Sequence, residues 1–291
     1  MTSGNIAVHP EGPWDGLVKP GYKAHKEGIT VGRKMAGRIN LWYNDGMYHD
    51  LLQEYYGDSD FYNYGYWDES TRDQKSACEN LMEKLLSFIP ERKGRILDVA
   101  CGKGATTAYL LRDFAAENVF GINISEKQLE TARKRAPGAT FLLMDAVQLD
   151  FEDNYFDHII CVEAVFHFET RGKFLEEAFR VMKPGGYLLL SDILLTEWGK
   201  GHRAWWVAES NVDLDADRYK EFCLSKGFSE TSVIDATKEC WECHCKSVAR
   251  FSEEKLLARQ MGVKKYETVA SRIFRLIPHI ETYVLLAAKK G

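Results

Sequence analysis

Five polar side chains follow apolar stretches in the middle of the chain, one after each stretch. They are Asp98, Asn123, Asp145, Glu163 and Asp192, and four of the five are acidic. A purely structural chain has little reason to place acids at the ends of apolar segments. Because a carboxylate attracts positive charge, the chemistry expected at these positions is recognition of a cationic small molecule.

A glycine-rich turn begins at the first of these acids and reads DVACGKGAT over residues 98–106. Gly102 and Gly104 lack a Cβ, so a ligand can approach the backbone closely. The turn is not a dinucleotide fingerprint, because Thr107 stands where the third glycine belongs, and a G-x-x-x-x-G-K-[ST] phosphate loop is also absent. Asp98 would repel a pyrophosphate, so the turn suits a cation better.

The elements that must position these residues alternate between strand and helix. Apolar runs predict strands at 95–100, 118–122, 140–144, 156–162, 187–190, 231–234 and 282–288. Helical spacing predicts helices at 71–89, 125–135, 174–182, 218–226 and over most of 252–276. Ser70 is expected to cap the first helix, and Ser125 with Gln128 to form a capping box. Short links imply parallel βαβ units, so the fold class is α/β with a doubly wound sheet that binds ligands at the carboxyl ends of its strands.

Composition excludes several other classes of protein. The 291 residues are 45% hydrophobic and 28% charged, with a formal net charge of -5 and no basic stripe, so a nucleic-acid partner is not expected. No apolar run is long enough to enter and cross a bilayer, and residues 1–12 lack the apolar core of a secretion signal. Seven cysteines, an odd number, indicate reduced thiols in a cytoplasmic protein. A homodimer is compatible with this composition.

Five ordered motifs resemble those of the class I, Rossmann-like S-adenosylmethionine-dependent methyltransferases. They lie at residues 98–104, 119–125, 145–146, 156–168 and 180–186. The first reads DVACGKG against the family pattern D-x-[GA]-C-G-x-G, and the last reads RVMKPGG. The resemblance is strong from about residue 63 to residue 192 and weak afterwards. It implies a seven-stranded, mostly parallel sheet whose last strand is antiparallel, with S-adenosylmethionine as the cofactor.

The resemblance also implies a role for residues near the methionine and ribose parts of the cofactor. Ala100, Gly102 and Gly104 should line the methionine part, with Asp98 towards its amino group. Asn123 should hold the ribose hydroxyls. The family often has an acid at the position of Asn123, where an amide can still bond a diol but without a bidentate carboxylate grip. Ala100 stands in place of a commoner glycine.

The same family pattern assigns a second group of residues to the adenine side. Ile124 should pack on the ring, Asp145 should accept a hydrogen bond from its amino group, and Ala146 should lie beside it. Gln128 and Glu163 are also expected to contact the cofactor. An alternative for Asp145 is a solvated loop acid.

His167 is the best candidate for a general base. Methyl transfer from a sulfonium needs an acceptor held in line with the methyl, and a base when the acceptor must lose a proton. His167 follows the fourth strand, where the family brings in its acceptor, and an imidazole ordinarily titrates near neutrality. The alternative is a core histidine satisfied by the backbone. Glu163 is the second catalytic candidate, with orientation of the loop as its more probable task.

The segment from residue 39 to 67 is rich in aromatic residues and contains the sequence NYGYW at 63–67. It resembles an element of the ubiquinone, tocopherol, sugar and sarcosine methyltransferases that covers the cofactor, which would place Tyr66 and Trp67 at the site. Aromatic faces also suit a sulfonium. Residues 1–70 are therefore predicted to be an arm and helical aromatic lid, and 71–291 the methyltransferase domain, with an acceptor-pocket insertion after strand five at about 194–266. The alternative is a helical cap that only covers the core.

The predicted function is methyl transfer to an O, N or C nucleophile of a small-molecule acceptor, a specialised metabolite. The alternatives are a protein or nucleic-acid methyltransferase on the same fold, or a non-catalytic Rossmann-like partner protein. The sequence CWECHC at 240–245 lacks the second ligand pair of a zinc site, so no metal is expected there.

Overall fold

The computed structural model describes residues 31–201, 207–208, 211 and 214–291, so the predicted arm at the N-terminus lies outside the described residues. The strands are β1 (Ile96–Val99), β2 (Val119–Asn123), β3 (Thr140–Leu143), β4 (Phe156–Val162), β5 (Met182–Leu195), β6 (Phe228–Asp235) and β7 (Ile280–Lys290). The helices are α1 (Val31–Gly46), α2 (Asp50–Tyr55), α3 (Gln74–Leu86), α4 (Ala105–Leu110), α5 (Glu126–Arg135), α6 (Arg171–Val181), α7 (Glu197–Gly201), α8 (Ala216–Ser225), α9 (Cys243–Leu257) and α10 (Val263–Leu276). Short helical turns are η1 (Ala116–Asn118), η2 (Val165–His167), η4 (Lys238–Glu242) and η5 (Ile277–His279).

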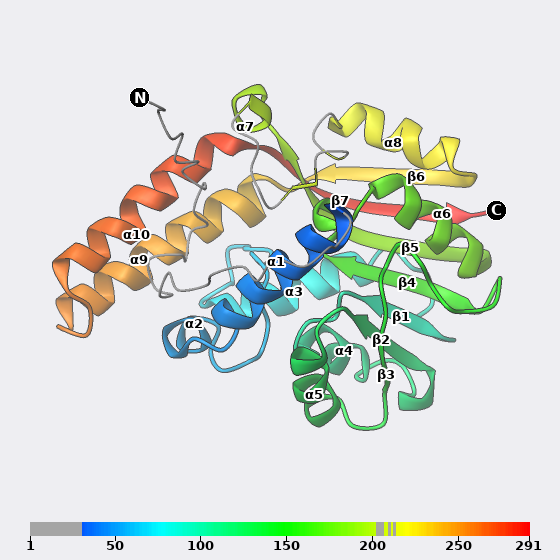
Figure 1. The fold of residues 1–291 in the computed structure, drawn as a ribbon, viewed down its shortest axis with the longest axis horizontal. Helices are drawn as coiled ribbons and strands as arrows, with labels where there is room; N and C mark the ends of the chain where they lie inside the picture. Colours follow the sequence, from blue (N-terminus) through cyan, green and yellow to red (C-terminus); the bar gives the residue numbers. More distant parts are fainter. Residues whose placement is uncertain (1–30, 202–206, 209–210, 212–213) are drawn as a thin grey trace, which may run out of the picture.

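Within the described residues, seven strands form one sheet in the order β3-β2-β1-β4-β5-β7-β6 (Figure 1). The neighbours from β3 to β5 are parallel. β7 runs antiparallel to both β5 and β6, with Leu190 of β5 opposite Leu286 of β7. The predicted doubly wound sheet with an antiparallel last strand is confirmed. Its parallel half brings the ends of β1, β2 and β4 to one edge.

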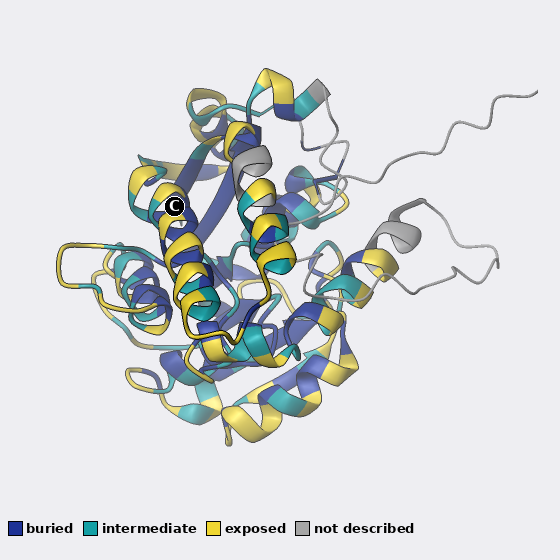
Figure 2. Ribbon diagram, turned by 90° about the vertical axis from the view of Figure 1, so that its left-hand side faces the viewer, coloured by how far each residue is buried: buried dark blue, intermediate teal, exposed yellow. Residues whose placement is uncertain are grey.

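Both faces of the sheet are covered because its strands alternate their apolar side chains between them. Ile160 of β4 packs with α3, α4 and α9 on one face. Its neighbours Ile159 and Cys161 pack with α6 and α8 on the other. Figure 2 shows the buried residues in the sheet and on the inner sides of the helices, with the exposed residues outside.

Local signals place several helix ends differently from the predictions. The side chain of Asp73 accepts the hydrogen bond from the N–H of Ser76, so Asp73 rather than Ser70 caps α3. Ser125 caps α5 as predicted, accepting from the N–H of Gln128. The predicted helix at 252–276 is two helices, α9 and α10, separated by residues 258–262.

Helices other than those that connect the parallel strands lie in two places along the C-terminal part of the chain. α7 and the segment up to residue 215 follow β5, whereas η4, α9 and α10 form an excursion between β6 and β7. The predicted insertion at 194–266 therefore contains β6, a strand of the central sheet. α9 and α10 run side by side and project beyond the sheet (Figure 1). None of the described helices combines the length and apolarity that crossing a membrane would require.

Candidate active site

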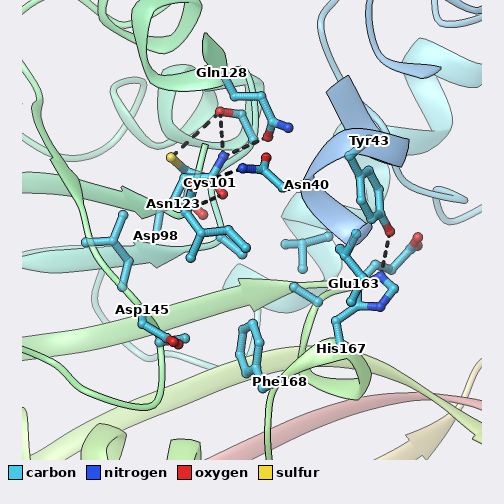
Figure 3. A pocket seen from close by; sticks show the side chains of 18 of the residues that line it. Asn40, Tyr43, Asp98, Cys101, Asn123, Gln128, Asp145, Glu163, His167 and Phe168 are labelled. Atoms are coloured by element: carbon cyan, nitrogen blue, oxygen red, sulfur yellow. Dashed lines mark hydrogen bonds between the residues drawn. The ribbon is translucent and has the colours of Figure 1, made fainter. Parts of the chain in front are cut away.

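A cavity of about 1560 Å³ opens where β1, β2 and β4 end. It is lined by nine of the twelve residues predicted to bind the cofactor, namely Asp98, Ala100, Gly102, Asn123, Ile124, Gln128, Asp145, Ala146 and Glu163. His167 also lines it, and one side is covered by Asn40 and Tyr43 of α1 and by Met47 just after that helix. Figure 3 shows these side chains converging from the strand ends, η2 and α1. Tyr66, Trp67 and Gly104 are not among the lining residues.

Asp98 is a buried acid at the end of β1. Its Oδ2 accepts hydrogen bonds from the hydroxyls of Thr106 at 2.5 Å and Thr107 at 2.6 Å. Burial raises its pKa to about 6, and the two hydroxyl bonds oppose that rise. Because the described residues supply it with hydroxyls and no cation, the carboxylate suits a positively charged ligand.

The two glycines of the turn do different things. Gly102 has a φ of +54° and lines the cavity, where an added Cβ would meet only Met47 Cε at 3.4 Å. Gly104 has a φ of +84°, and an added Cβ would lie 2.7 Å from Cα of Ala132 on α5. The missing side chain of Gly104 therefore lets α4 approach α5, and its predicted contact with the cofactor stays a prediction. Ala100 has a φ of +59°, a conformation that strains a non-glycine residue by about 1–2 kcal/mol.

Asn123 belongs to a chain of side-chain amides at the end of β2. Its Nδ2 donates to Oε1 of Gln128 at 2.7 Å, and Gln128 Nε2 donates to Oδ1 of Asn44 on α1 at 2.8 Å. The hydroxyl of Ser125 donates to the same Asn44 oxygen. Gln128 is thus directed to Asn123 and Asn44 instead of returning to Ser125, so the predicted reciprocal capping box is half formed. The network orients Asn123 beside the cavity.

The residues predicted to contact adenine lie on two neighbouring loops of the cavity. Ile124 is a large apolar residue that remains 37% exposed, and its N–H donates to Oδ1 of Asn123. The Oδ1 of Asp145 accepts from the N–H of Val147 at 3.2 Å, and Ala146 is buried beside it. An apolar side chain next to a carboxylate at the mouth matches the demands of a ring that bears an amino group.

Glu163 lies just beyond β4 with a φ of +50° and reaches into the cavity. Its Oε1 accepts two hydrogen bonds, from the N–H of Tyr64 at 2.8 Å and from the hydroxyl of Tyr283 at 2.7 Å. Its own N–H donates to the carbonyl and hydroxyl oxygens of Ser191 on β5. Burial raises the pKa of the carboxyl to about 8, although the two donors act against this rise.

His167 forms a pair with Tyr43 of α1 across the cavity wall. The Nε2 atom of His167 and the hydroxyl oxygen of Tyr43 are 2.8 Å apart, and the two rings meet edge to face (Figure 3). Burial raises the pKa of Tyr43 well above its ordinary value, with Tyr62 and Glu163 adding to the rise. The phenol therefore stays protonated and can donate to a neutral imidazole. His167 lines the cavity, whereas the alternative interpretation expected it in the core.

Tyr66 and Trp67 lie away from the cavity. The N–H of Tyr66 donates to the carbonyl of Ala77 on α3, and that of Trp67 to the carbonyl of Glu239 on η4. An added Cβ at Gly65 would lie 2.5 Å from Cβ of Ala77, so this loop packs directly on α3. The aromatic residues that do line the cavity are Tyr43, Phe61, Tyr62 and Phe168. Three of these four lie in the predicted aromatic segment at 39–67, whereas Tyr66 and Trp67 of that segment do not line the cavity.

Polar contacts that the sequence did not reveal join the segment before α3 to the glycine-rich turn and to α5, which border the cavity. The buried ammonium of Lys103, inside the glycine-rich turn, lies 2.5 Å from Oδ1 of Asp60. The hydroxyl of Tyr48 donates to the carbonyl of Lys127 on α5 at 2.9 Å. The spacing of Ile39, Tyr43 and Met47, four residues apart, was the one available signal that one face of α1 points inward.

Asp192, the fifth residue predicted to follow a strand, lies inside β5, which extends to Leu195, and does not line the cavity. Its carboxylate is fully buried and makes a two-point ion pair with Arg171, at 2.6 Å and 3.0 Å. The hydroxyl of Tyr219 donates to the same carboxylate at 2.8 Å. The acid neutralises a buried arginine and therefore serves the fold.

The segment after β5 reaches the cavity at Val207 and Ala208, the described residues of 194–266 that line it. The N–H of Ala208 donates to the carbonyl of Phe166 and so closes this segment on η2. The clustered cysteines lie elsewhere, with Cys240 and Cys245 buried and Cys243 half-buried, all as free thiols. In the described part of the chain, no group of three metal-ligating side chains is assembled.

The arrangement fits S-adenosylmethionine. The cofactor carries an ammonium and a sulfonium, and the cavity presents Asp98 and Glu163 with no described cation to balance either. Gly102, Asn123 and Ile124 line the cavity, as expected for residues that would contact the methionine, ribose and adenine parts. When bound, the cofactor supplies an electrophilic methyl, and the chain supplies a pocket that holds the acceptor against it.

Comparison with known proteins agrees with this chemistry. A methyltransferase-domain family model matches residues 97–190. The chain is 31% identical over 259 residues to the 27-O-demethylrifamycin SV methyltransferase of Amycolatopsis mediterranei. This match covers 83% of this chain and 93% of that protein. It is 36% identical over 156 residues to the methyltransferase GfsG of Streptomyces halstedii, and this match spans 50% of this chain and 55% of GfsG.

Solved structures of low identity share the fold. The [4+2]-cyclase SpnF superposes with a TM-score of 0.67 at 23% identity, covering 88% of this chain and 97% of that one. The geranyl diphosphate C-methyltransferase of Streptomyces coelicolor superposes with a TM-score of 0.65 at 15% identity, covering 91% and 100%.

The sheet order and the cavity at its strand ends define the Rossmann-like fold of the class I methyltransferases. The match to the Amycolatopsis relative, over 83% of this chain and 93% of that protein, shows that the chain belongs to the S-adenosylmethionine-dependent methyltransferases that act on small molecules.

Proposed function

We propose that this enzyme methylates a hydroxyl oxygen of a bulky specialised metabolite, with Tyr43 and His167 removing the hydroxyl proton. The observation that carries the proposal is the 2.8 Å contact between the Tyr43 hydroxyl and His167 Nε2 in the wall of the cavity. A hydroxyl acceptor must lose a proton as its oxygen attacks the methyl. The proton passes to the Tyr43 oxygen while Tyr43 gives its own proton to Nε2.

The size of the cavity supports a bulky acceptor. Ligand pockets commonly span roughly 300–1,000 Å³, whereas this cavity is about 1560 Å³, which accommodates a cofactor and a second molecule. Phe168, Val207 and Ala208 give the acceptor side apolar walls. The name of the Amycolatopsis relative specifies an O-demethylated rifamycin as its substrate, which favours oxygen over nitrogen or carbon here.

The test is a methyl-transfer assay with isotopically labelled S-adenosylmethionine. The acceptors are 27-O-demethylrifamycin SV, a set of hydroxylated polyketides, their O-methylated forms, and amine-bearing analogues. The expected product gains one methyl on oxygen, and acceptors whose hydroxyl is already methylated stay unlabelled. Transfer only to the amines, or only to added protein or nucleic acid, would overturn the proposal.

A further inference from the structure

The cavity is acidic, and most of its acids are already paired. Seven carboxylates and three cationic side chains line it. Four of the acids have cationic partners: Asp60 with Lys103, Glu169 with Lys173, Glu176 with Lys226 and Glu177 with Arg180. The three without a cation among the described residues are Asp98, Asp145 and Glu163. Two of these, Asp98 and Glu163, lie deep in the cavity wall, where burial opposes their ionisation.

The hydrogen bonds of Glu163 are one-sided. Both donors, the N–H of Tyr64 and the hydroxyl of Tyr283, bind Oε1. The described residues direct no donor at Oε2, and Glu163 lines the cavity. One oxygen is therefore fixed by the protein, and the other is left to a ligand or to the carboxyl's own proton.

The titratable groups whose charges would act on Glu163 are tyrosines and thiols, and the imidazole of His167 lies in the same cavity wall. The tyrosines and thiols are Tyr43 on α1, Tyr56 after α2, Tyr64 in the loop before α3, Cys78 on α3, Cys240 on η4 and Tyr283 on β7, and Ser191 on β5 adds a hydroxyl. The tyrosines and thiols in this set all have a raised pKa because they are buried, so they stay neutral. None of these neutral groups of the described chain balances a negative charge on Glu163.

The reaction requires a cation, the sulfonium of the cofactor, in the part of the cavity where Glu163 lies. The acceptor must meet the methyl near Tyr43 and His167, and the methyl is bonded to the sulfonium. Glu163 precedes His167 by four residues and lies in the same wall, so the carboxyl and the positive sulfur share this end of the cavity. Asp98, at the end of β1, is then the acid available to bind the ammonium group of the cofactor.

We propose that Glu163 is the counter-charge of the sulfonium: it gives up a proton to solvent when S-adenosylmethionine binds and regains one when S-adenosylhomocysteine is formed. On transfer, the acceptor atom would form a bond to the methyl carbon as the carbon–sulfur bond breaks; the sulfur would keep the electron pair of that bond, so the positive charge beside Glu163 would disappear. The carboxylate then takes a proton from solvent. The inference rests on the proposed function in one respect, the transfer of the methyl beside Tyr43 and His167, and it is independent of which acceptor is methylated.

The expected consequence is discrimination between cofactor and product. A nearby opposite charge favours the ionised carboxylate, and loss of that charge restores the neutral acid. Glu163 therefore strengthens binding of the sulfonium form and leaves the neutral thioether without this support. Since ionisation is coupled to binding, the affinity for S-adenosylmethionine should fall relative to S-adenosylhomocysteine as the pH is lowered below about 8.

Titration calorimetry at pH 7.5 in buffers of different ionisation enthalpy measures the protons released on binding. The ligands are S-adenosylmethionine, its unreactive cationic analogue sinefungin, and S-adenosylhomocysteine. The two cationic ligands should release more than half a proton beyond the amount released by S-adenosylhomocysteine, as expected for a group with a pKa of about 8. Because all three ligands carry the same amino acid group, its titration cancels in the comparison.

Glu163→Gln keeps the shape and both hydrogen bonds to Oε1 but removes the charge. It should abolish the excess proton release and lower the ratio of affinities for S-adenosylmethionine and S-adenosylhomocysteine by about tenfold. Glu176→Gln is the matched control, because this acid also lines the cavity but is paired with Lys226, and it should retain the excess release. Tyr283→Phe removes one donor to the carboxylate and should move the pH midpoint of the effect upward.

Equal proton release with all three ligands would overturn the inference, as would an excess that persists in Glu163→Gln. Should Glu163→Gln fail to fold, an unmoved midpoint in Tyr283→Phe would refute the proposal by itself. Either failure leaves the proposed methylation of a hydroxyl intact, because product formation is measured separately. Conversely, an enzyme that methylates only amines would refute the proposed acceptor without affecting the proton measurement.

Discussion

The hydroxyl oxygen of Tyr43 lies 2.8 Å from Nε2 of His167, although 124 residues separate them in the chain. The contact joins α1 to η2 across the cavity in which the cofactor and the acceptor must meet. A motif in the central part of the chain supplies the imidazole, and the N-terminal helix supplies the group that reaches it. The pair explains why the covering helix belongs to the active site.

The first prediction concerns catalysis by this pair. His167→Ala should lower kcat by about a hundredfold to ten-thousandfold, the usual effect of losing a general base. Tyr43→Phe should lower it to a similar extent, and the double variant should be no slower than either single variant because the two groups act as one unit. The measurement is kcat at saturating acceptor, with cofactor affinity determined by calorimetry.

The control for this prediction is the affinity for S-adenosylhomocysteine, which should stay nearly constant because the residues expected to hold its adenosine and amino acid parts follow β1, β2 and β3 and not η2. If Tyr43→Phe keeps the parental kcat while His167→Ala loses it, His167 takes the proton directly. Two variants with parental kcat would mean that positioning alone suffices for transfer.

The second prediction separates the two glycines of the turn. Gly104→Ala should lower the free energy of unfolding by roughly 1–3 kcal/mol, because the new methyl would overlap the backbone of Ala132 on α5. Gly102→Ala meets only the end of the Met47 side chain, so it should cost stability only through its positive φ while weakening cofactor binding. Urea unfolding and calorimetry, performed on both variants, distinguish the effects. A Gly104→Ala protein of parental stability that binds the cofactor poorly would contradict this division of roles.

The glycines also illustrate what the sequence could and could not predict. The positions of the strands and the edge of the sheet that holds the site followed from local patterns, since apolar runs define the strands and acids mark their ends, whereas the antiparallel last strand followed from the family resemblance. The partner of Gly104 could not be read locally, because Ala132 lies on the next helix and only the packing of α4 on α5 brings them together.

The same limit explains the other differences between sequence and structure. Asp192 follows the strand-end pattern as well as Asp98 does, yet Arg171, on a helix 21 residues earlier, neutralises it. Tyr66 and Trp67 match a family element, but Gly65 lets their loop lie against α3, which directs them away from the cavity. In each case a contact between distant segments decides the role of a residue whose type and spacing alone were ambiguous.

The third prediction concerns the buried ion pair of Arg171 and Asp192. Asp192→Asn should lower the free energy of unfolding by about 3–5 kcal/mol, because it leaves the buried guanidinium without its counter-charge. The exposed pair of Arg133 and Glu126 offers a control, and Glu126→Gln should cost about 1 kcal/mol or less. Urea unfolding curves provide both values. Equal effects at the two sites would show that Arg171 finds another partner.

The last prediction is the pH dependence of stability without cofactor. Asp98 and Glu163 have ordinary pKa values of 3.8 and 4.5, but the fold raises them to about 6 and about 8. Between about pH 4 and pH 8, the native protein therefore holds protons that the unfolded chain has released, so this pair makes the free energy of unfolding fall as the pH rises. The fall is present in full above pH 8 and absent below about pH 4.

Glu163→Gln should reduce it by roughly 2–4 kcal/mol over this window, whereas Glu176→Gln should not. Urea unfolding at pH 5 to 8.5 measures the slope. S-adenosylmethionine should restore stability most at the alkaline end, where the ionised carboxylates meet their cations, and a parental slope in Glu163→Gln would show that this carboxyl ionises without cost.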